Sequence, residues 1–327
     1  MADNATMTAR SSAGGLLSRL PFMPALAILV LLIALNGWFE PNSLSFRAIT
    51  GLVSTYLALV MLAIAQTYVV MAGDIDLSVG AILSLVNVVV IVLMERWGGS
   101  GVMVLAACGL GIATGLACGL FNGLVVAALR LQAIVATFAT SILFTGLALY
   151  VLPVAGTPAP ATYWRTYGGR ILEIPFVFWV VGALAILMVV LVRTRLSLQL
   201  LAVGDDAQGA YQSGLPVTRI RIQGYVLCGL FSALAALCIT GDTASGDPLV
   251  GGKMTLYSVA AVVLGGSALA GGSATIVGSL VGAFIIGLIN SLVFFVGTPS
   301  EWQNLVQGFA ILLALMGGVF VGRRVGR

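Results

Sequence analysis

Ten runs of apolar residues, separated by short polar stretches, constrain this chain more than any other feature of its sequence. A membrane-spanning helix needs about 20 predominantly apolar residues. Only 8% of the residues are charged and 60% are hydrophobic, whereas a soluble domain carries about 25% charged residues. We therefore expect an all-α membrane protein with about ten transmembrane helices. The runs cover residues 21–36, 50–71, 81–94, 102–129, 134–152, 174–192, 222–240, 254–269, 275–296 and 305–321.

Two of these runs, 81–94 and 254–269, are short and are interpreted as partial spans or half-helices. The first run has no convincing small-residue cleavage site after it, which favours a retained first helix over a removed signal peptide. Residues 1–20 are expected to form a cytoplasmic tail. Residues 21–321 then form the membrane domain, and residues 322–327 form a second cytoplasmic tail.

The positions of the basic residues test this topology, because loops rich in Lys and Arg are retained in the cytoplasm. With both termini cytoplasmic, ten of the fifteen basic residues fall inside and five fall outside. The inside group is Arg10, Arg19, Arg130, Arg193, Arg195, Arg219, Arg221, Arg323, Arg324 and Arg327. The outside group is Arg47, Arg96, Arg165, Arg170 and Lys253. This bias agrees with ten spans and two cytoplasmic termini.

Two similar stretches indicate an internal repeat. Residues 119–125 read GLFNGLV and residues 287–293 read GLINSLV, and the two stretches occupy the fourth and ninth runs. In a ten-span chain these runs cross in opposite directions, as the halves of an inverted five-plus-five repeat do. Chance similarity between two glycine-rich runs is the competing explanation.

The stretch GDIDLSVG at 73–80 places two carboxylates between two apolar runs. Acidic residues at membrane depth are costly and usually functional, so Asp74, Asp76 and Ser78 are candidates for a polar cavity or a fixed helix break. The structural alternative is that Asp76 and Ser78 cap the following helix while Asp74 occupies a cytosolic turn.

Few polar residues lie within the runs, and neutral amides among them can orient a neutral polar solute. They also commonly hydrogen-bond neighbouring helices, which is the more frequent role of any single one. The candidates for a solute pathway are Gln66, Asp74, Asp76, Asn122 and Asn290.

The polar interval 193–221, bounded by arginines at both ends, contains a compact helix signature. Asp205 or Asp206 can cap a helix over residues 207–213, Gly214 can adopt a left-handed stop, and Pro216 prevents continuation. A short ordered helix between two spans suggests a docking element, and an ordinary solvated loop is the alternative. The docking candidates are Asp205, Asp206, Ala207, Gln208, Gly209, Ala210, Tyr211, Gln212, Ser213 and Gly214.

Several classes of chemistry lack their residues in this chain. It has no histidine, one lysine and no phosphate-binding GxxxxGK[ST] motif, so we expect no nucleotide hydrolysis by the chain itself and no catalytic residue. The four cysteines lie within apolar runs and are expected to act as small hydrophobes. We expect no metal site, no cofactor and no nucleic-acid partner.

Four stretches, taken in order, resemble the ribose-type permease subunits of bacterial ABC importers. They are GDIDLSVG at 73–80, GLFNGLV at 119–125 with TFATSILFTGLAL at 137–149, AVGDDAQGAYQSGLPV at 202–217, and AAVVLGGSALAGGSATIVGSLVGA at 260–283. The resemblance covers nearly the whole chain, from about residue 43 to residue 316.

The resemblance implies a permease domain over residues 21–321 in the bacterial inner membrane, paired with a second permease subunit. It further implies a cytoplasmic ATPase pair, which hydrolyses the ATP, and a periplasmic solute-binding protein. Asp205–Gly214, within the cytoplasmic coupling loop 193–221, resembles the coupling helix that sits in a cleft of the ATPase. The expected solute is a sugar or a related small polar molecule.

This chain departs from the family pattern at several positions. Asp74 replaces the second glycine of the signature, LQA at 131–133 replaces a proline-containing turn, and Tyr257 lies where the family often has an aspartate. Asp205 and Asp206 replace a glycine and a small polar residue. The alternative function is an ion-coupled secondary transporter, which would show a similar repeat. A membrane scaffold without transport is a third class.

Overall fold

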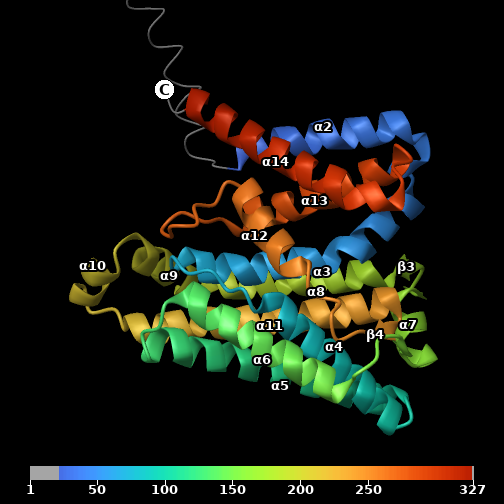
Figure 1. Cartoon of the computed structure of the whole chain (residues 1–327), viewed down its shortest axis with the longest axis horizontal. Helices are drawn as coiled ribbons and strands as arrows, with labels where there is room; N and C mark the ends of the chain where they lie inside the picture. The colour runs from blue at the N-terminus through green and yellow to red at the C-terminus, as the bar shows by residue number, and fades with distance from the viewer. Residues whose placement is uncertain (1–21, 326–327) are drawn as a thin grey trace, which may run out of the picture.

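The computed structural model describes residues 22–325, which form a bundle of helices with most long axes along one direction (Figure 1). The prediction of an all-α membrane protein is confirmed, and each of the ten apolar runs contains a helix. The helices of these runs are α2 (Met23–Phe39), α3 (Phe46–Met71), α4 (Val79–Arg96), α5 (Gly101–Gly123), α6 (Ala133–Val151), α8 (Phe176–Arg193), α11 (Val217–Thr243), α12 (Met254–Leu264), α13 (Ile276–Phe295) and α14 (Ser300–Val325).

Short elements connect these helices. They are the 3-10 turn η1 (Pro41–Leu44), the π turn η2 (Leu124–Ala128), the helices α7 (Ala161–Tyr167), α9 (Leu196–Asp205) and α10 (Ala207–Gln212), and the two-residue strands β1 (Thr157–Pro158), β2 (Arg170–Ile171), β3 (Ile174–Pro175) and β4 (Ser245–Gly246). Strand β1 pairs antiparallel with β4, and β2 with β3.

Seven helices of residues 22–325 are long and apolar enough to cross a membrane: α3, α4, α5 with its π turn, α6, α8, α11 and α13. Helix α4 has 18 residues and is among them, so the expectation of a partial span there is wrong. Helix α12 has 11 residues and rises only about 16 Å at 1.5 Å per residue. It is therefore a half-length helix, as the short run at 254–269 indicated.

The predicted tail at 1–20 lies outside the described residues, as do residues 326 and 327 of the second tail. Helix α14 continues through Val325, beyond the end of the last apolar run.

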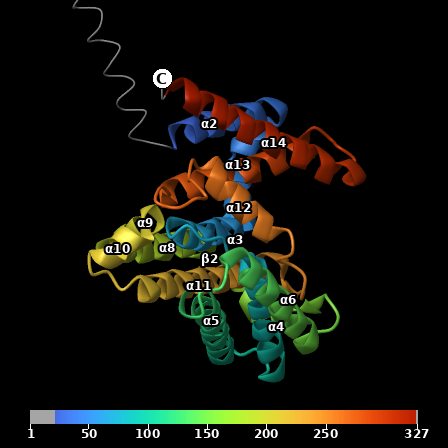
Figure 2. The ribbon, with the colours of Figure 1, turned by 60° about the vertical axis from the view of Figure 1, so that its left-hand side comes forward.

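The core of the bundle is formed by α3, α4 and α11. Every residue of α3 from Leu57 to Met71 is buried, as expected of a helix that is apolar on all sides and surrounded by other helices. Helix α4 lies between α5 and α6 (Figure 2) and packs on both. In contrast, only Val177 and Leu184 of α8 are buried, so most of α8 lies on the surface of the bundle.

Helices α5 and α11 approach closely through glycines. A Cβ at Gly119 would lie 3.0 Å from the Cα of Gly229, and a Cβ at Gly229 would lie 2.9 Å from the Cα of Gly119. Such contacts leave no space for side chains, and small residues allow helix backbones to approach in this way. The first of the two repeated stretches therefore packs directly against α11.

The bundle has two distinct ends (Figure 1). Helix α10 lies at one end, together with the end of α14, and helix α7 lies at the opposite end. Helix α11 starts beside α10 and runs for 27 residues, or about 40 Å, toward the end that carries α7. This placement positions all the sites described below.

The interval 193–221 is more ordered than its polar composition suggested. Besides the expected short helix α10, it contains the ten-residue helix α9, whose Leu200 and Val203 are buried. Gly204 lies against the backbone of the α3 end, because a Cβ at this position would lie 2.7 Å from the N atom of Gly272 and 3.0 Å from the Met71 carbonyl carbon. Helix α9 thus attaches α10 firmly to the core.

Candidate functional site

The segment before α4 enters the bundle and carries a buried polar cluster. Asp76 Oδ1 accepts hydrogen bonds from the N–H and the hydroxyl of Ser78, both at 2.7 Å. Asn122 Nδ2 donates to Ser78 Oγ at 2.7 Å and, over 3.4 Å, to Asp76 Oδ2. With its amide oriented to suit both neighbours, Gln66 donates to the Asp76 carbonyl oxygen and accepts from the Asp76 N–H. All four residues are fully buried.

The cluster brings together three of the five predicted pathway residues: Gln66, Asp76 and Asn122. Gln66 lies five residues before the end of α3, which places the cluster about 8 Å inside that end. Gln66, Asp76 and Ser78 are hydrogen-bonded within the cluster, as buried polar groups must be to offset the loss of water, whereas Asn122 Oδ1 is buried and accepts no hydrogen bond among the described residues. The arrangement fixes the break between α3 and α4.

The helix-capping alternative for Ser78 is wrong. Ser78 occupies the N-cap position of α4, but its side chain makes no cap hydrogen bond, since its hydroxyl donates to Asp76. The free N–H of Gly80 in the first turn donates instead to Thr255 Oγ1 of α12, at 3.1 Å. Thr255, 175 positions away, thus accepts the hydrogen bond of this N–H group. This bond connects α12 to the break before α4.

Asp74 lies away from the cluster and is joined to the start of α11. Arg221 Nη2 lies 2.7 Å from Asp74 Oδ1 and 2.8 Å from Oδ2, and Arg221 Nε lies 3.1 Å from Oδ2. The guanidinium therefore binds both carboxylate oxygens through its Nε and Nη2 groups. The side chain of Asp74 is 9% exposed and that of Arg221 is 25% exposed.

A second irregular segment enters the bundle from the opposite end, between α11 and α12. Asn87 in α4 donates to the Ser245 carbonyl oxygen at 3.2 Å and accepts from the Asp247 N–H at 2.8 Å. One turn nearer the start of α4, Ser84 Oγ accepts from the Gly251 N–H at 2.9 Å. Segment 244–253 therefore runs antiparallel to α4 before α12 begins. Irregular backbone at membrane depth occurs where it is buried in protein or lines a cavity.

This second segment lines a pocket of about 500 Å³ that contains Asn290. The pocket walls come from α3, from the segment and the start of α12, and from α13. They comprise Thr55, Tyr56, Leu59, Asp247, Leu249, Val250, Gly252, Lys253, Met254, Tyr257 and Asn290. Among the described residues, Asn290 Oδ1 accepts no hydrogen bond of ordinary geometry. This oxygen is buried, and Tyr56 is its polar neighbour in the wall of the pocket.

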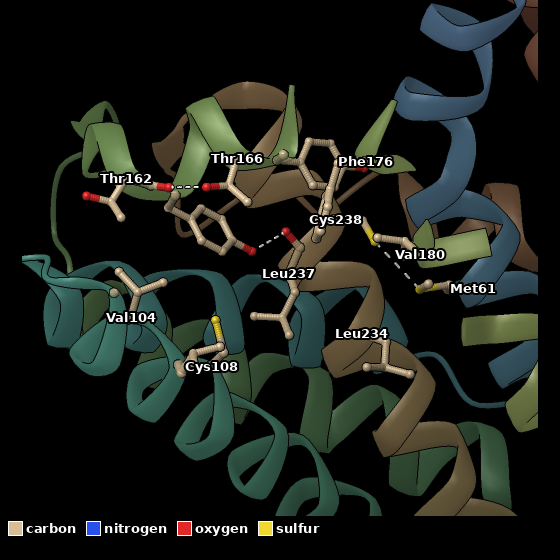
Figure 3. Close-up of a pocket in the computed structure, with 14 residues that line it drawn as sticks. Met61, Val104, Cys108, Thr162, Thr166, Phe176, Val180, Leu234, Leu237 and Cys238 are labelled. Atoms are coloured by element: carbon tan, nitrogen blue, oxygen red, sulfur yellow. Dashed lines mark hydrogen bonds between the residues drawn. The ribbon is translucent and has the colours of Figure 1, made fainter. Parts of the chain in front are cut away.

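A different cavity, of about 380 Å³, lies under α7 and is almost entirely apolar (Figure 3). Its walls include Val104, Leu234, Leu237 and Phe176, and the Tyr163 hydroxyl is occupied by a bond to the Leu237 carbonyl oxygen at 2.7 Å. None of the five predicted pathway residues lines it. The cavity lacks free polar groups for a polar solute.

The predicted docking helix is present as α10, one residue shorter than expected. Asp206, rather than Asp205, is its N-cap and accepts from the Gln208 N–H at 3.0 Å, while Asp205 ends α9. Ser213 is the C-cap, and Gly214 has φ +84° as predicted for the stop. Ala210 is buried and Tyr211 is 71% exposed. Helix α10 therefore presents an exposed face at its end of the bundle (Figure 1).

Sequence reasoning did not find several residues of these sites. Arg221 was identified only as a topology marker, and Thr55 and Tyr56 carried no signal because they lie in an ordinary apolar run. Tyr257 did carry a signal, as a departure from the family pattern, and it lines the Asn290 pocket. The four cysteines are free, as expected, and Cys228 Sγ lies 3.6 Å from Asp76 Oδ2.

Comparison with known proteins assigns the chain to a family. Residues 48–315 match the family described as branched-chain amino acid transport system / permease component. The ribose import permease protein RbsC of Escherichia coli K12 is 33% identical over 298 residues, covering 89% of this chain and 92% of the relative. RbsC of Bacillus subtilis 168 is 35% identical over 305 residues, covering 90% and 91%.

A third relative is the autoinducer 2 import system permease protein LsrC of Yersinia pseudotuberculosis IP 31758. It is 32% identical over 309 residues, covering 91% of this chain and 84% of the relative. No solved structure matches the chain. The resemblance to ribose-type permeases is thereby confirmed, and the chain is a transport subunit rather than an enzyme. It belongs to the branched-chain amino acid transport system / permease component family.

Proposed function

We propose that this chain is the permease subunit of an ABC importer that carries a sugar or a related small polar solute across the bacterial inner membrane. The observation that carries the proposal is the placement of two features at different levels of one bundle. The pocket around Asn290 lies along the segment that enters from the α7 end, and the exposed helix α10 lies at the other end. Solute entry and energy input are thus separated along the direction of transport.

The Asn290 pocket is the proposed site of solute contact. Asn290 contributes an amide group beside Tyr56, and Thr55, Tyr56 and Tyr257 add hydroxyl groups to the same walls. Neutral donors and acceptors of this kind bind a neutral polyol without the cost of burying a charge. The relatives are named for the import of ribose and autoinducer 2. Because Tyr257 lies in this pocket, at a position where the family often has an aspartate, the identity of the solute is not carried over from these relatives.

The other four predicted pathway residues shape the route without touching the solute. Gln66 and Asp76 are hydrogen-bonded within the cluster, Asn122 donates its amide N–H groups to Ser78 and Asp76, and Asp74 is engaged by Arg221. Their role in this proposal is to hold the break before α4. The pairing of Asp74 with Arg221 argues against the ion-coupled alternative, because it leaves Asp76 as the one carboxylate of the 73–80 stretch without a cationic partner.

We further propose ten spans, with both termini cytoplasmic, arranged as an inverted repeat of α2–α6 and α8–α14. Helix α5 packs on α11, and α13 packs on α3. Each helix that carries one of the two repeated stretches therefore lies against a long helix of the other half. Asn122 in the first repeated stretch faces the break before α4. Asn290 in the second repeated stretch shares a pocket with the segment before α12. The two halves thus repeat one arrangement from opposite ends.

The proposed partners follow from the same arrangement. Residues 205–214, with α10 at their centre, dock in a cleft of a cytoplasmic ATPase subunit, which binds and hydrolyses the ATP. A second permease subunit completes the channel, and a periplasmic binding protein delivers the solute to the end that carries α7. The close contacts of Gly204 with residues 71 and 272 support a rigid link from α10 to the break before α4 and to the loop before α13.

The test is the rate of ATP hydrolysis by the ATPase subunit in vesicles that contain this chain. Solute-loaded binding protein, added on the side opposite the ATPase, is expected to raise the rate several-fold over unloaded binding protein. Replacing Tyr211 by Asp on the exposed face of α10 is expected to remove the stimulation. A rate that is the same with and without this chain would refute the proposal.

A further inference from the structure

A pocket of about 710 Å³ opens beside α10, between the end of α5 and the start of α11. We name it the basic notch. Its lining residues are Ala127, Arg130, Leu131, Ala207, Tyr211, Pro216, Val217, Thr218, Arg219, Arg221 and Ile222. Three separate stretches of the chain thus meet there, and one wall belongs to the proposed docking helix.

The basic notch carries positive charge without a counter-charge. Of its three arginines, Arg221 is occupied by Asp74. No described carboxylate forms an ion pair with Arg130 or Arg219 within 4 Å, so these two arginines line the pocket without a carboxylate partner. Two guanidinium groups that line one pocket form a fork-shaped site suited to a carboxylate or a phosphate.

The backbone at Arg130 is in a conformation that arginine rarely adopts. Arg130 has φ +57° and follows the π turn Leu124–Ala128. Left-handed backbone at a residue other than glycine is strained, and both such strain and π turns cluster at functional sites. The LQA stretch directly after Arg130 is also a place where this chain departs from its family. The strained turn places Arg130 in the wall of the notch.

We propose that the basic notch is a second part of the ATPase docking surface, in which Arg130 and Arg219 bind an Asp or Glu side chain of the ATPase. This inference rests on the proposed function, since it requires an ATPase at α10. Two observations favour a protein partner over a lipid headgroup. Ala207 and Tyr211 of α10 form one wall, and α10 is the outermost element at its end of the bundle in both views (Figures 1 and 2). A partner that covers exposed Tyr211 therefore also covers the notch.

Acidic and basic residues occupy different parts of this docking surface, which gives the partner a defined orientation. Asp205 and Asp206 are exposed at the start of α10, whereas Arg130 and Arg219 lie in the notch beside it. Opposite charges at two ends of one surface set the register of docking and exclude partners with the reverse pattern. The notch thereby contributes to the choice of ATPase.

The experiment measures the Kd of the purified ATPase subunit for the full chain in nanodiscs made only of phosphatidylcholine. The double variant R130A/R219A is expected to raise the Kd at least tenfold and to flatten its dependence on NaCl concentration. The matched control R193A/R195A removes two exposed arginines at the same end that do not line the notch. This control is expected to keep the Kd within twofold of the wild type.

A further variant, Arg130→Gly, separates binding from folding. Glycine suits φ +57° better than arginine does, so this variant is expected to unfold at the same temperature as the wild type or higher while its Kd rises. An unchanged Kd in both R130A/R219A and Arg130→Gly, with wild-type binding intact, would overturn the notch proposal and leave the proposed function standing. Wild-type chain that does not bind the ATPase would overturn both. A defect seen only in discs that contain phosphatidylglycerol would reassign the notch to a lipid headgroup.

Discussion

Asp74 and Arg221, 147 residues apart in the sequence, form a bidentate ion pair that joins the end of α3 to the start of α11, directly after the docking helix. Asp74 stands where the family signature has glycine. The pair connects the proposed energy input to the break before α4.

The two partners of this pair are expected to respond unequally to removal. Arg221→Ala leaves the Asp74 carboxylate, 9% exposed, without a partner and should cost about 1–3 kcal/mol of unfolding free energy. Asp74→Gly leaves an arginine that is 25% exposed and reaches water more easily, so it should cost less than about 1 kcal/mol. Thermal unfolding in detergent measures both. Equal losses, or no recovery in the double variant, would contradict this assignment.

The Asp76 cluster is expected to support structure. Asp76→Ala removes the acceptor of the Ser78 N–H and hydroxyl and leaves buried donors unpaired, at a cost of about 2–3 kcal/mol. The yield of folded chain should fall, while the KM for solute of the folded fraction stays the same. Asn122→Ala provides a second removal within the cluster. A KM that rises tenfold at unchanged stability would instead place Asp76 in contact with the solute.

The Asn290 pocket is expected to set affinity for the solute. Asn290→Leu keeps the side-chain size and removes the amide group, so the KM should rise at least tenfold while ATPase binding is unchanged. Asn42→Leu makes the same chemical change at an exposed position outside the pocket and should leave transport as it is. Tyr257→Asp should shift the preference among polyols. If Asn290→Leu transports with wild-type kinetics, the pocket is not the site.

An added methyl group at Gly229 is expected to destabilise the contact between α5 and α11. A Cβ there meets the backbone of Gly115 and Gly119, so Gly229→Ala should cost about 1–3 kcal/mol through overpacking. Gly182→Ala in α8 is the matched control, because a Cβ at Gly182 meets nothing within 4 Å. It should stabilise α8 by up to about 1 kcal/mol. Unfolding temperatures of the two variants that move together would contradict the close contact.

How much the sequence predicts depends on whether the signal is local. The ten apolar runs located ten helices because a helix in lipid must be apolar along its length. Asp206 and Gly214 predicted the boundaries of α10, since a cap and a left-handed stop act within a few residues. The α12 run was expected to extend to residue 269 but ends at Leu264, where Gly265 and Gly266 begin a turn with φ +85° at Gly266.

The parts that were not predicted depend on contacts between distant residues. Segment 244–253 has no helical or strand periodicity, and its course is set by hydrogen bonds to Asn87 and Ser84. The Asp74–Arg221 pair and the Gly80–Thr255 bond each join residues more than 140 positions apart. Helix α9 was not recognised because its apolar residues lie in a stretch read as a polar interval. The division of the five pathway candidates between cluster, ion pair and pocket has the same origin.

Solute uptake into vesicles that hold this chain, its ATPase subunit and its binding protein tests the central claim most directly. Uptake is predicted to require ATP on the side of α10, to persist when ion gradients are collapsed, and to stop when Tyr211 in α10 is replaced by Asp. Uptake that proceeds without ATP and disappears with the ion gradient would contradict the importer and establish an ion-coupled transporter.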